Sequence, residues 1–277
     1  MGTQSSVTSA VPLRTADGVR LAATYTPARG TGHVAIVLVP GFSGWSGKPG
    51  VARATAVLAE YADVLQVDLR GHGRSGGRST LADREVFEVD AAVAYLRSLG
   101  HERVVTVGFS MGGAAVIRHA ALVGHEVHGH LLTQPVDAVV CVSTGGTWYI
   151  RDTKPMKRLH FLVLTRLGRV IAREVFRVRI DPKGWGKEPL SPLDAAARLT
   201  VPLLVVHGDR DSYLRERHAV ALSQAATGPV ELWMESGFGH AEEAADPQLL
   251  RRIGATLPRL VELGSPLEPS PPVVIDD

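Results

Sequence analysis

Short apolar runs alternate along most of this chain with longer segments whose apolar residues recur every three or four positions. Residues 34–39 are wholly apolar and predict a strand buried on both faces. Residues 81–99 place Val86, Val89 and Val93 on one face, as an amphipathic helix does. Further strands are predicted at 13–15, 19–26, 64–68, 103–107, 136–143, 201–206 and 230–234, and further helices at 51–61 and 112–123. This alternation predicts an α/β fold with a mostly parallel sheet and helices on both faces.

The alternation stops near residue 145 and resumes at the strand 201–206. We therefore expect one α/β domain that carries a small helical insertion. The terminal stretches differ from the core, because the first residues are polar and the last are rich in proline. The expected organisation is a flexible N-terminus over 1–10, a core over 11–144 and 196–263, a cap insertion over 145–195 and a disordered tail over 264–277.

The insertion contains a basic amphipathic segment. Residues 157–178 predict a single helix, and four arginines follow one another on it at spacings of three and four: Arg166, Arg169, Arg173 and Arg177. Charged stripes usually face water, so the favoured interpretation is a cap helix with a solvated arginine face. The alternative is a basic rim that attracts anionic substrates or makes peripheral contact with a membrane surface.

Composition excludes several classes of protein. The net charge of +2 is far below that of a typical nucleic-acid-binding domain, so no nucleic-acid partner is expected. The single cysteine, Cys141, excludes an internal disulfide and fits a reducing compartment. The chain has no apolar run of membrane-spanning length, and its first residues lack the basic and apolar regions of a signal peptide. We expect a cytoplasmic protein without a transmembrane span.

The pentapeptide Gly108-Phe109-Ser110-Met111-Gly112 has the form G-x-S-x-G. It follows the predicted strand 103–107 and precedes the predicted helix 112–123. A serine on such a turn is held out from the sheet, and its glycines let the strand and helix approach closely. Free N–H groups at a helix N-terminus can also stabilise a developing oxyanion. Ser110 is therefore the candidate nucleophile.

A nucleophilic serine needs a general base and an acid that orients the base. Asp211 follows the predicted strand 201–206, and His240 follows the strand 230–234. Ser110, Asp211 and His240 thus occur in the order that this kind of sheet requires, each just past a strand end. Asp209, in the same turn as Asp211, is an alternative acid.

With these motifs the chain resembles the α/β-hydrolase superfamily, and within it the cap-bearing serine esterases, lipases and peptidase-like members. The resemblance covers roughly residues 11–263. Its matching segments are the nucleophile elbow 108–113, the loop 40–42, the turn 68–75, Gly208-x-x-Asp211 and Gly239-His240. Family members often have His-Gly on the loop where this chain has Pro40-Gly41.

The resemblance implies an acyl-enzyme mechanism on a small-molecule acyl ester. It implies that Asp211 is the acid and that the backbone N–H groups of Phe42 and Met111 form the oxyanion hole. A serine in the elbow excludes relatives that use aspartate there, and the triad needs no metal or other cofactor. The alternatives are a thioesterase, a peptidase, a C–C bond hydrolase or a non-catalytic ligand-binding member of the fold.

Three histidines, His125, His128 and His130, lie in the predicted loop 124–135. No cysteine or carboxylate cluster joins them in sequence, so we interpret the segment as a surface connection rather than a metal site. The sequence gives this loop no role.

Overall fold

The computed structural model describes residues 8–29 and 34–264. Its centre is an eight-stranded sheet in the order β1-β2-β4-β3-β5-β8-β9-β10. The two pairs that contain β2 are antiparallel and all others are parallel, which confirms the predicted sheet. The strands are β1 (Ser9–Arg14), β2 (Arg20–Thr26), β3 (Val34–Val39), β4 (Asp63–Val67), β5 (Arg103–Phe109), β8 (Ala138–Val142), β9 (Leu203–Gly208) and β10 (Val230–Glu235).

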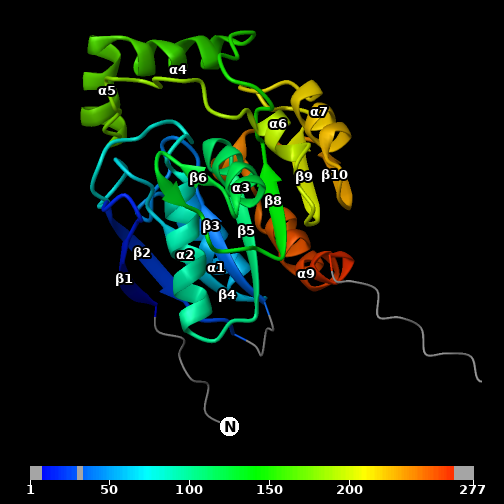
Figure 1. Ribbon diagram of the computed structural model, residues 1–277. Coiled ribbons are helices and arrows are strands. Elements are labelled where there is room, and N and C mark those ends of the chain that lie inside the picture. Colours follow the sequence, from blue (N-terminus) through cyan, green and yellow to red (C-terminus); the bar gives the residue numbers. More distant parts are fainter. Residues whose placement is uncertain (1–7, 30–33, 265–277) are drawn as a thin grey trace, which may run out of the picture.

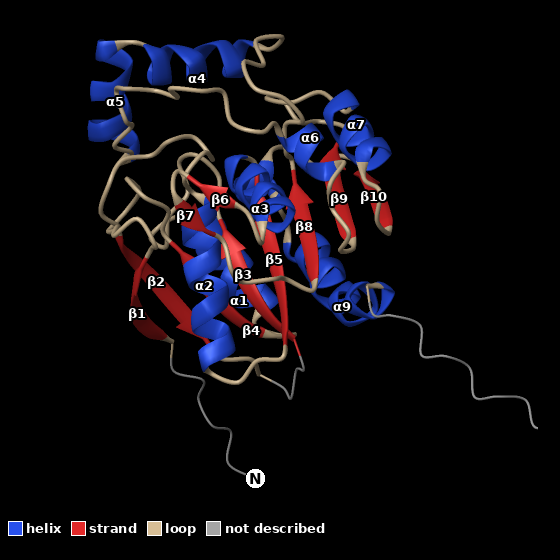
Figure 2. Ribbon diagram, viewed as in Figure 1, coloured by secondary structure: helices blue, strands red, loops and turns tan. Residues whose placement is uncertain are grey.

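Helices cover both faces of this sheet, as Figure 2 shows. On β3, Val37 and Val39 pack into one core, whereas Ile36 and Leu38 pack into the other. One face carries α2 (Val86–Ser98), α3 (Met111–Leu122), α6 (Pro192–Ala196) and α7 (Arg217–Ala225), and the other α1 (Pro49–Leu58), α8 (Ala241–Ala244) and α9 (Pro247–Leu263). Because both faces are covered, the central strands are continuous apolar runs and not alternating ones.

Of the three helices between β8 and β9, two lie over the edge of the sheet at which β8 ends (Figure 1). They are α4 (Lys154–Leu164) and α5 (Arg166–Phe176). The prediction of a single helix over 157–178 is wrong, because Thr165 is extended and its hydroxyl accepts a hydrogen bond from the N–H of Gly168 at 2.9 Å. A Cβ on Gly168 would lie 2.1 Å from the carbonyl oxygen of Phe161, so glycine permits the two helices to meet closely.

The arginines of the predicted stripe all follow this break and differ in their surroundings. Arg166 and Arg173 are exposed on α5. Arg169 instead donates hydrogen bonds to the carbonyl oxygens of Val163 and Leu164 at the end of α4. Arg177 lies beyond α5 in a left-handed conformation, with its guanidinium over a tryptophan ring. Arg166, Arg169 and Arg173 thus line one recess beside α5, whereas Arg177 lies beyond the helix.

Other boundaries differ from the prediction by a few residues. The strand β1 begins at Ser9, inside the stretch expected to be flexible. The helix α2 begins at Val86 rather than at residue 81, since Leu81 and Ala82 have positive φ angles. The segment 124–135 contains a short hairpin, β6 (Glu126–Val127) paired with β7 (His130–Leu131). Apart from Gly264, the predicted disordered tail lies outside the described residues.

Candidate functional site

Ser110 lies between the end of β5 and the first residue of α3, with φ +50° and ψ −112°. This conformation is strained for a residue with a side chain and lifts the hydroxyl above the sheet edge. Close packing fixes the turn. A Cβ on Gly112 would lie 2.2 Å from the carbonyl oxygen of Val39, and one on Gly108 would lie 2.5 Å from that of Gly112. The glycines of the motif are thus required by contacts between the backbone segments.

The structure brings Ser110, His240 and Asp211 together from three loops. The Oγ of Ser110 lies 3.0 Å from Nε2 of His240, and Nδ1 of His240 lies 2.7 Å from Oδ2 of Asp211. A carboxylate can only accept, so Nδ1 carries the proton and leaves Nε2 free to accept from the serine hydroxyl. This arrangement can deprotonate Ser110 and hold the resulting imidazolium beside a negative charge.

The environment of Asp211 keeps its carboxylate ionised. Its side chain is fully buried, and its other oxygen accepts the N–H groups of Tyr213 and Leu214 at 2.8 and 3.0 Å. Burial opposes ionisation, but the hydrogen bond with His240 and the backbone donors outweigh it and lower the pKa of Asp211. The carboxylate of Asp209 does not contact His240; it accepts hydrogen bonds from the hydroxyl of Ser236 and the N–H of Gly237.

The two predicted oxyanion donors belong to different segments of the chain. Met111 opens α3, and Phe42 lies on the loop after β3; both line the same cavity as Ser110. Among the described residues, neither N–H donates a hydrogen bond to a loop or side-chain acceptor. The buried His72 contacts the carbonyl oxygen of Phe42 at 2.5 Å through Nε2 and that of Arg70 at 2.9 Å through Nδ1. His72, which lies in the turn 68–75, therefore also contacts the loop 40–42.

Sequence reasoning missed Glu242. Its side chain is buried beside the nucleophile, and Oε1 accepts the N–H of Gly41 at 3.0 Å, whereas Oε2 has no partner among the described residues. Burial raises the pKa of Glu242, against the opposing effect of its backbone hydrogen bonds. No pattern distinguished it from the adjacent Glu243, which is exposed. Its position two residues after His240 was the only available signal.

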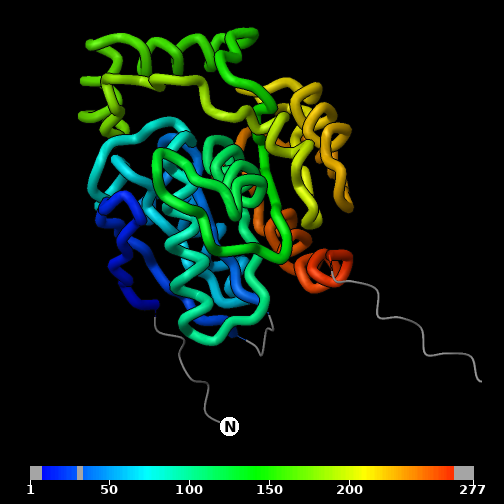
Figure 3. The backbone as a smooth tube through the Cα atoms, in the orientation of Figure 1, coloured from blue at the N-terminus to red at the C-terminus, as the bar shows by residue number. Residues whose placement is uncertain are grey.

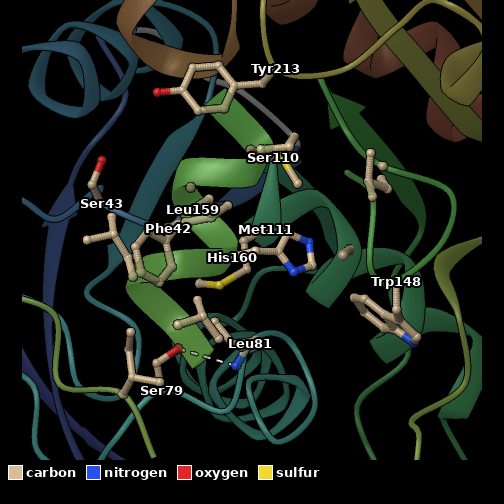
Figure 4. A pocket seen from close by; sticks show the side chains of 18 of the residues that line it. Phe42, Ser43, Ser79, Leu81, Ser110, Met111, Trp148, Leu159, His160 and Tyr213 are labelled. Atoms are coloured by element: carbon tan, nitrogen blue, oxygen red, sulfur yellow. Dashed lines mark hydrogen bonds between the residues drawn. The ribbon is translucent and has the colours of Figure 1, made fainter. Parts of the chain in front are cut away.

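A cavity of about 870 Å³ lies beside Ser110, between α4 and the sheet edge. Its walls are largely apolar, and Figure 4 shows Phe42, Met111, Leu159 and Trp148 around the space next to the serine. The ring of Tyr213 stacks on His240 at 4.4 Å between centroids. A cavity of this size and lining fits an apolar substrate group of several carbon atoms.

The three histidines of the β6–β7 region do not converge. His128 contacts a carboxyl oxygen of Asp83 at 2.8 Å, and His130 packs against the ring of Phe87. His125 is exposed. Within residues 8–29 and 34–264, no group of three His, Cys, Asp or Glu side chains could hold a metal ion. Over the same ranges, every helix is too short or too polar to cross a bilayer.

Comparison with known proteins places this site in context. The sequence pattern described as "Alpha/beta hydrolase family" matches residues 36–264. The monoacylglycerol lipase of Mycolicibacterium smegmatis is 30% identical over 204 residues, which are 64% of this chain and 70% of the lipase. Human alpha/beta hydrolase domain-containing protein 17B is 24% identical over 196 residues, covering 69% of this chain and 54% of that protein.

Solved structures share the fold. The Pyrococcus furiosus esterase Pf2001 superimposes with a TM-score of 0.68 at 21% identity, over 92% of this chain and 93% of the esterase. Est1E from Butyrivibrio proteoclasticus, solved with ferulic acid bound, gives a TM-score of 0.61 at 19% identity, over 90% and 99% of the two chains. At these identities the likeness establishes the architecture alone.

Proposed function

This chain belongs to the alpha/beta hydrolase family, and from that premise we propose that it is a serine hydrolase that cleaves carboxylic esters through an acyl-enzyme. The observation that carries the proposal is the continuous chain of hydrogen bonds from Ser110 through His240 to Asp211. A structural serine would need neither an imidazole acceptor nor a buried carboxylate behind it.

In the proposed reaction, Oγ of Ser110 attacks the ester carbonyl while Nε2 of His240 accepts its proton. The oxyanion that forms is stabilised by the N–H groups of Phe42 and Met111, each worth about 3 kcal/mol in comparable enzymes. His240 then protonates the leaving alcohol. A water molecule, whose proton His240 accepts, next attacks the carbonyl of the acyl-enzyme and releases the carboxylic acid and Ser110. Asp211 holds the imidazole in the required tautomer throughout.

The substrate that fits best has an apolar acyl group. The wall of the cavity contains side chains from the start of α3, such as Met111, and from α4, such as Leu159. Burying acyl carbons there contributes about 0.8 kcal/mol for each methylene group. The relationship to a monoacylglycerol lipase supports the same substrate class. Thioesters are a second class that the same triad and cavity would accept.

A fluorophosphonate probe tests the proposal directly. We expect one covalent adduct on the wild-type protein by intact mass and none on Ser110→Ala. Turnover of p-nitrophenyl butyrate should fall by about 10⁶-fold in the same variant, because the nucleophile is lost. Circular dichroism of both proteins controls for folding. An adduct or full turnover in a folded Ser110→Ala protein would contradict the mechanism.

A further inference from the structure

The outer surface of α4 and α5 exposes an unusual concentration of apolar side chains. Thirteen large hydrophobic residues are exposed in the part of the chain that the structure describes, and five of them lie on these two helices. They are Phe161, Leu164, Leu167, Val170 and Val175, with Leu167 63% and Val175 66% exposed. Exposed clusters of this kind mark interaction surfaces.

The same two helices are strongly basic. Residues 154–177 contain seven Lys and Arg and one acidic residue, Glu174. Over 145–195 the counts are eleven basic and five acidic residues, whereas the rest of the chain has 19 basic and 23 acidic. The segment 145–195 therefore has a net charge of +6, whereas the rest of the sequence has −4, and the basic segment favours contact with an anionic surface.

One recess on this surface is suited to an anionic group. It has a volume of about 250 Å³ and lies beside the exposed Val170. Five arginines line it and no acidic residue does: Arg78, Arg166, Arg169, Arg173 and Arg179. Guanidinium groups bind phosphate oxygens in a bidentate manner, so a phosphodiester fits this recess.

The basic, apolar surface also lies next to the cavity. Arg169, Ile180 and Pro182 line both the recess and the cavity that contains Ser110. Figure 3 shows the segment that contains α4 and α5 at one end of the molecule, with α5 turning down from the end of α4. A flat partner that contacts these two helices would thus lie close to the candidate active site.

We propose that the outer face of α4 and α5 docks on an anionic lipid surface, with Leu164 and Leu167 in the apolar layer and Arg166 and Arg173 at the phosphates. Amphipathic segments that are basic and only moderately hydrophobic bind membranes in this way. A second copy of the chain is disfavoured as the occupant, because a symmetric contact would bring two strongly positive caps together. The proposal is independent of the catalytic activity.

Vesicle flotation of the full-length Ser110→Ala protein tests the docking surface without hydrolysis of lipid. We expect binding to phosphatidylcholine vesicles that contain about a third phosphatidylglycerol, weak binding to pure phosphatidylcholine, and loss of binding at high salt. Arg166→Glu with Arg173→Glu should lower the partition coefficient more than about 20-fold. Leu164→Ser with Leu167→Ser should lower it by about ten-fold.

Matched variants keep the test specific. Arg14→Glu with Arg20→Glu makes the same charge change at the exposed pair on β1 and β2, and Leu99→Ser with Leu131→Ser removes two equally exposed leucines. Both controls should bind vesicles more tightly than the cap variants. Equal binding to neutral and anionic vesicles, or equal loss in cap and control variants, would overturn the proposal. So would a dimer in light scattering that the cap substitutions abolish.

A separate observation concerns Glu242. Its Oε1 binds the N–H of Gly41, and a Cβ on Gly41 would lie within 3.4 Å of both carboxyl oxygens of Glu242 and of Cβ of Ser110. The carboxyl group and the nucleophile thus flank the same residue. The next residue, Phe42, carries a proposed oxyanion donor, so a charge on Glu242 would oppose the oxyanion at short range.

We further infer that Glu242 is a positioning residue, which holds the loop 40–42 while its carboxyl group is uncharged and impairs catalysis once it ionises. The inference rests on the proposed esterase activity. The charged groups nearest to it are His240, Glu243 and Arg53, whose guanidinium binds the carbonyl oxygens of Glu242 and Glu243. Burial favours the neutral form of the Glu242 carboxyl group. Its Oε2 has no hydrogen-bond partner among the described residues, and a buried charge without a partner would be costly.

The pH dependence of kcat separates this role from simple packing. Wild-type kcat should decline by about ten-fold or more as pH rises through the ionisation of Glu242, whose pKa is raised by burial. Glu242→Gln retains an acceptor for the N–H of Gly41 and cannot ionise, so the decline in kcat with rising pH should be absent from this variant. Glu243→Gln, on the exposed neighbour, should keep the wild-type profile. Glu242→Ala should lower kcat at neutral pH because the loop loses its partner.

Two results would overturn the inference. One is superimposable pH profiles of kcat for wild type and Glu242→Gln, and the other is an equal loss of kcat in Glu242→Gln and Glu242→Ala. Fluorophosphonate labelling rates over the same pH range provide a readout that needs no ester turnover. If wild type is labelled but the profiles coincide, only the role of Glu242 is wrong. If folded wild type is neither labelled nor active, the proposed function fails as well.

Discussion

At the scale of single residues, two aspartates in one turn have different surroundings. Asp211 is buried against His240 and accepts two backbone N–H groups, whereas Asp209 binds Ser236 and Gly237 at the surface. The sequence left both as possible acids because they lie two residues apart. Only Asp211 is placed where a carboxylate can orient the imidazole.

Asparagine substitutions test that difference. Asp211→Asn should lower kcat by about 10⁴-fold, because an amide stabilises the wrong tautomer of His240. Asp209→Asn should change kcat less than about three-fold, since it removes only a surface contact. Ester hydrolysis at neutral pH measures both. Comparable losses in the two variants would contradict the assignment of the acid.

Asp211 should also make stability depend on pH. Its pKa in the folded protein lies below its ordinary value of 3.8, so the unfolded chain binds the proton first as pH falls. The contribution of Asp211 to stability is therefore complete above that value and is lost as pH falls through the folded pKa. Wild type should lose more in Tm than Asp211→Asn between pH 5 and pH 2, as measured by calorimetry. A parallel loss in both proteins would contradict this expectation.

At the scale of elements, the strand-turn-helix unit β5-Ser110-α3 depends on contact between backbones. Gly112 lies against the carbonyl oxygens of Val39 and Pro40, at the end of β3. Neither atom can move without shifting the loop that carries Phe42. The geometry of the nucleophile and that of the proposed oxyanion hole are therefore coupled through one glycine.

Gly112→Ala should destabilise the protein by about 1–3 kcal/mol, because the new methyl group overpacks this contact. It should also reduce ester turnover by displacing Ser110 and Phe42. Gly186→Ala is the matched control, since a Cβ there meets no atom within 4 Å. Denaturant unfolding of the two variants checks the prediction, and equal stabilities would refute it.

At the scale of the whole molecule, the cavity exists because α4 lies over the sheet edge. Leu159 of α4 lines it, whereas Phe161, two residues later on the same helix, is 45% exposed. The depth of the cavity thus depends on the position of α4 relative to the sheet.

Filling this space should change selectivity for acyl length. Leu159→Trp should reduce kcat/KM for p-nitrophenyl octanoate at least about ten-fold relative to the acetate, because long chains lose their space. Phe161→Trp makes a similar change on the outer surface and should leave the ratio unaltered. A series of p-nitrophenyl esters measures the ratio. An unchanged preference in Leu159→Trp would exclude this cavity as the acyl site.

The sequence by itself determined the α/β class, most strands and helices and the family, because buried strands and amphipathic helices have local periodic patterns. Its order of Ser110, Asp211 and His240 was sufficient to nominate the site, although their roles stay a prediction. The division of 157–178 into two helices was missed, since it depends on the hydrogen bond of Thr165 and the packing of Gly168.

Only the tertiary structure decided which groups meet. Ser110 and His240 are 130 positions apart, and their 3.0 Å contact requires β5 and β10, which β8 and β9 separate in the sheet, to end at the same edge. The burial of Glu242 against Gly41 joins residues 201 positions apart, and no local pattern reports it. Local periodicity indicates which face of a helix or strand is buried. The residues against which that face packs depend on the tertiary fold of the whole chain.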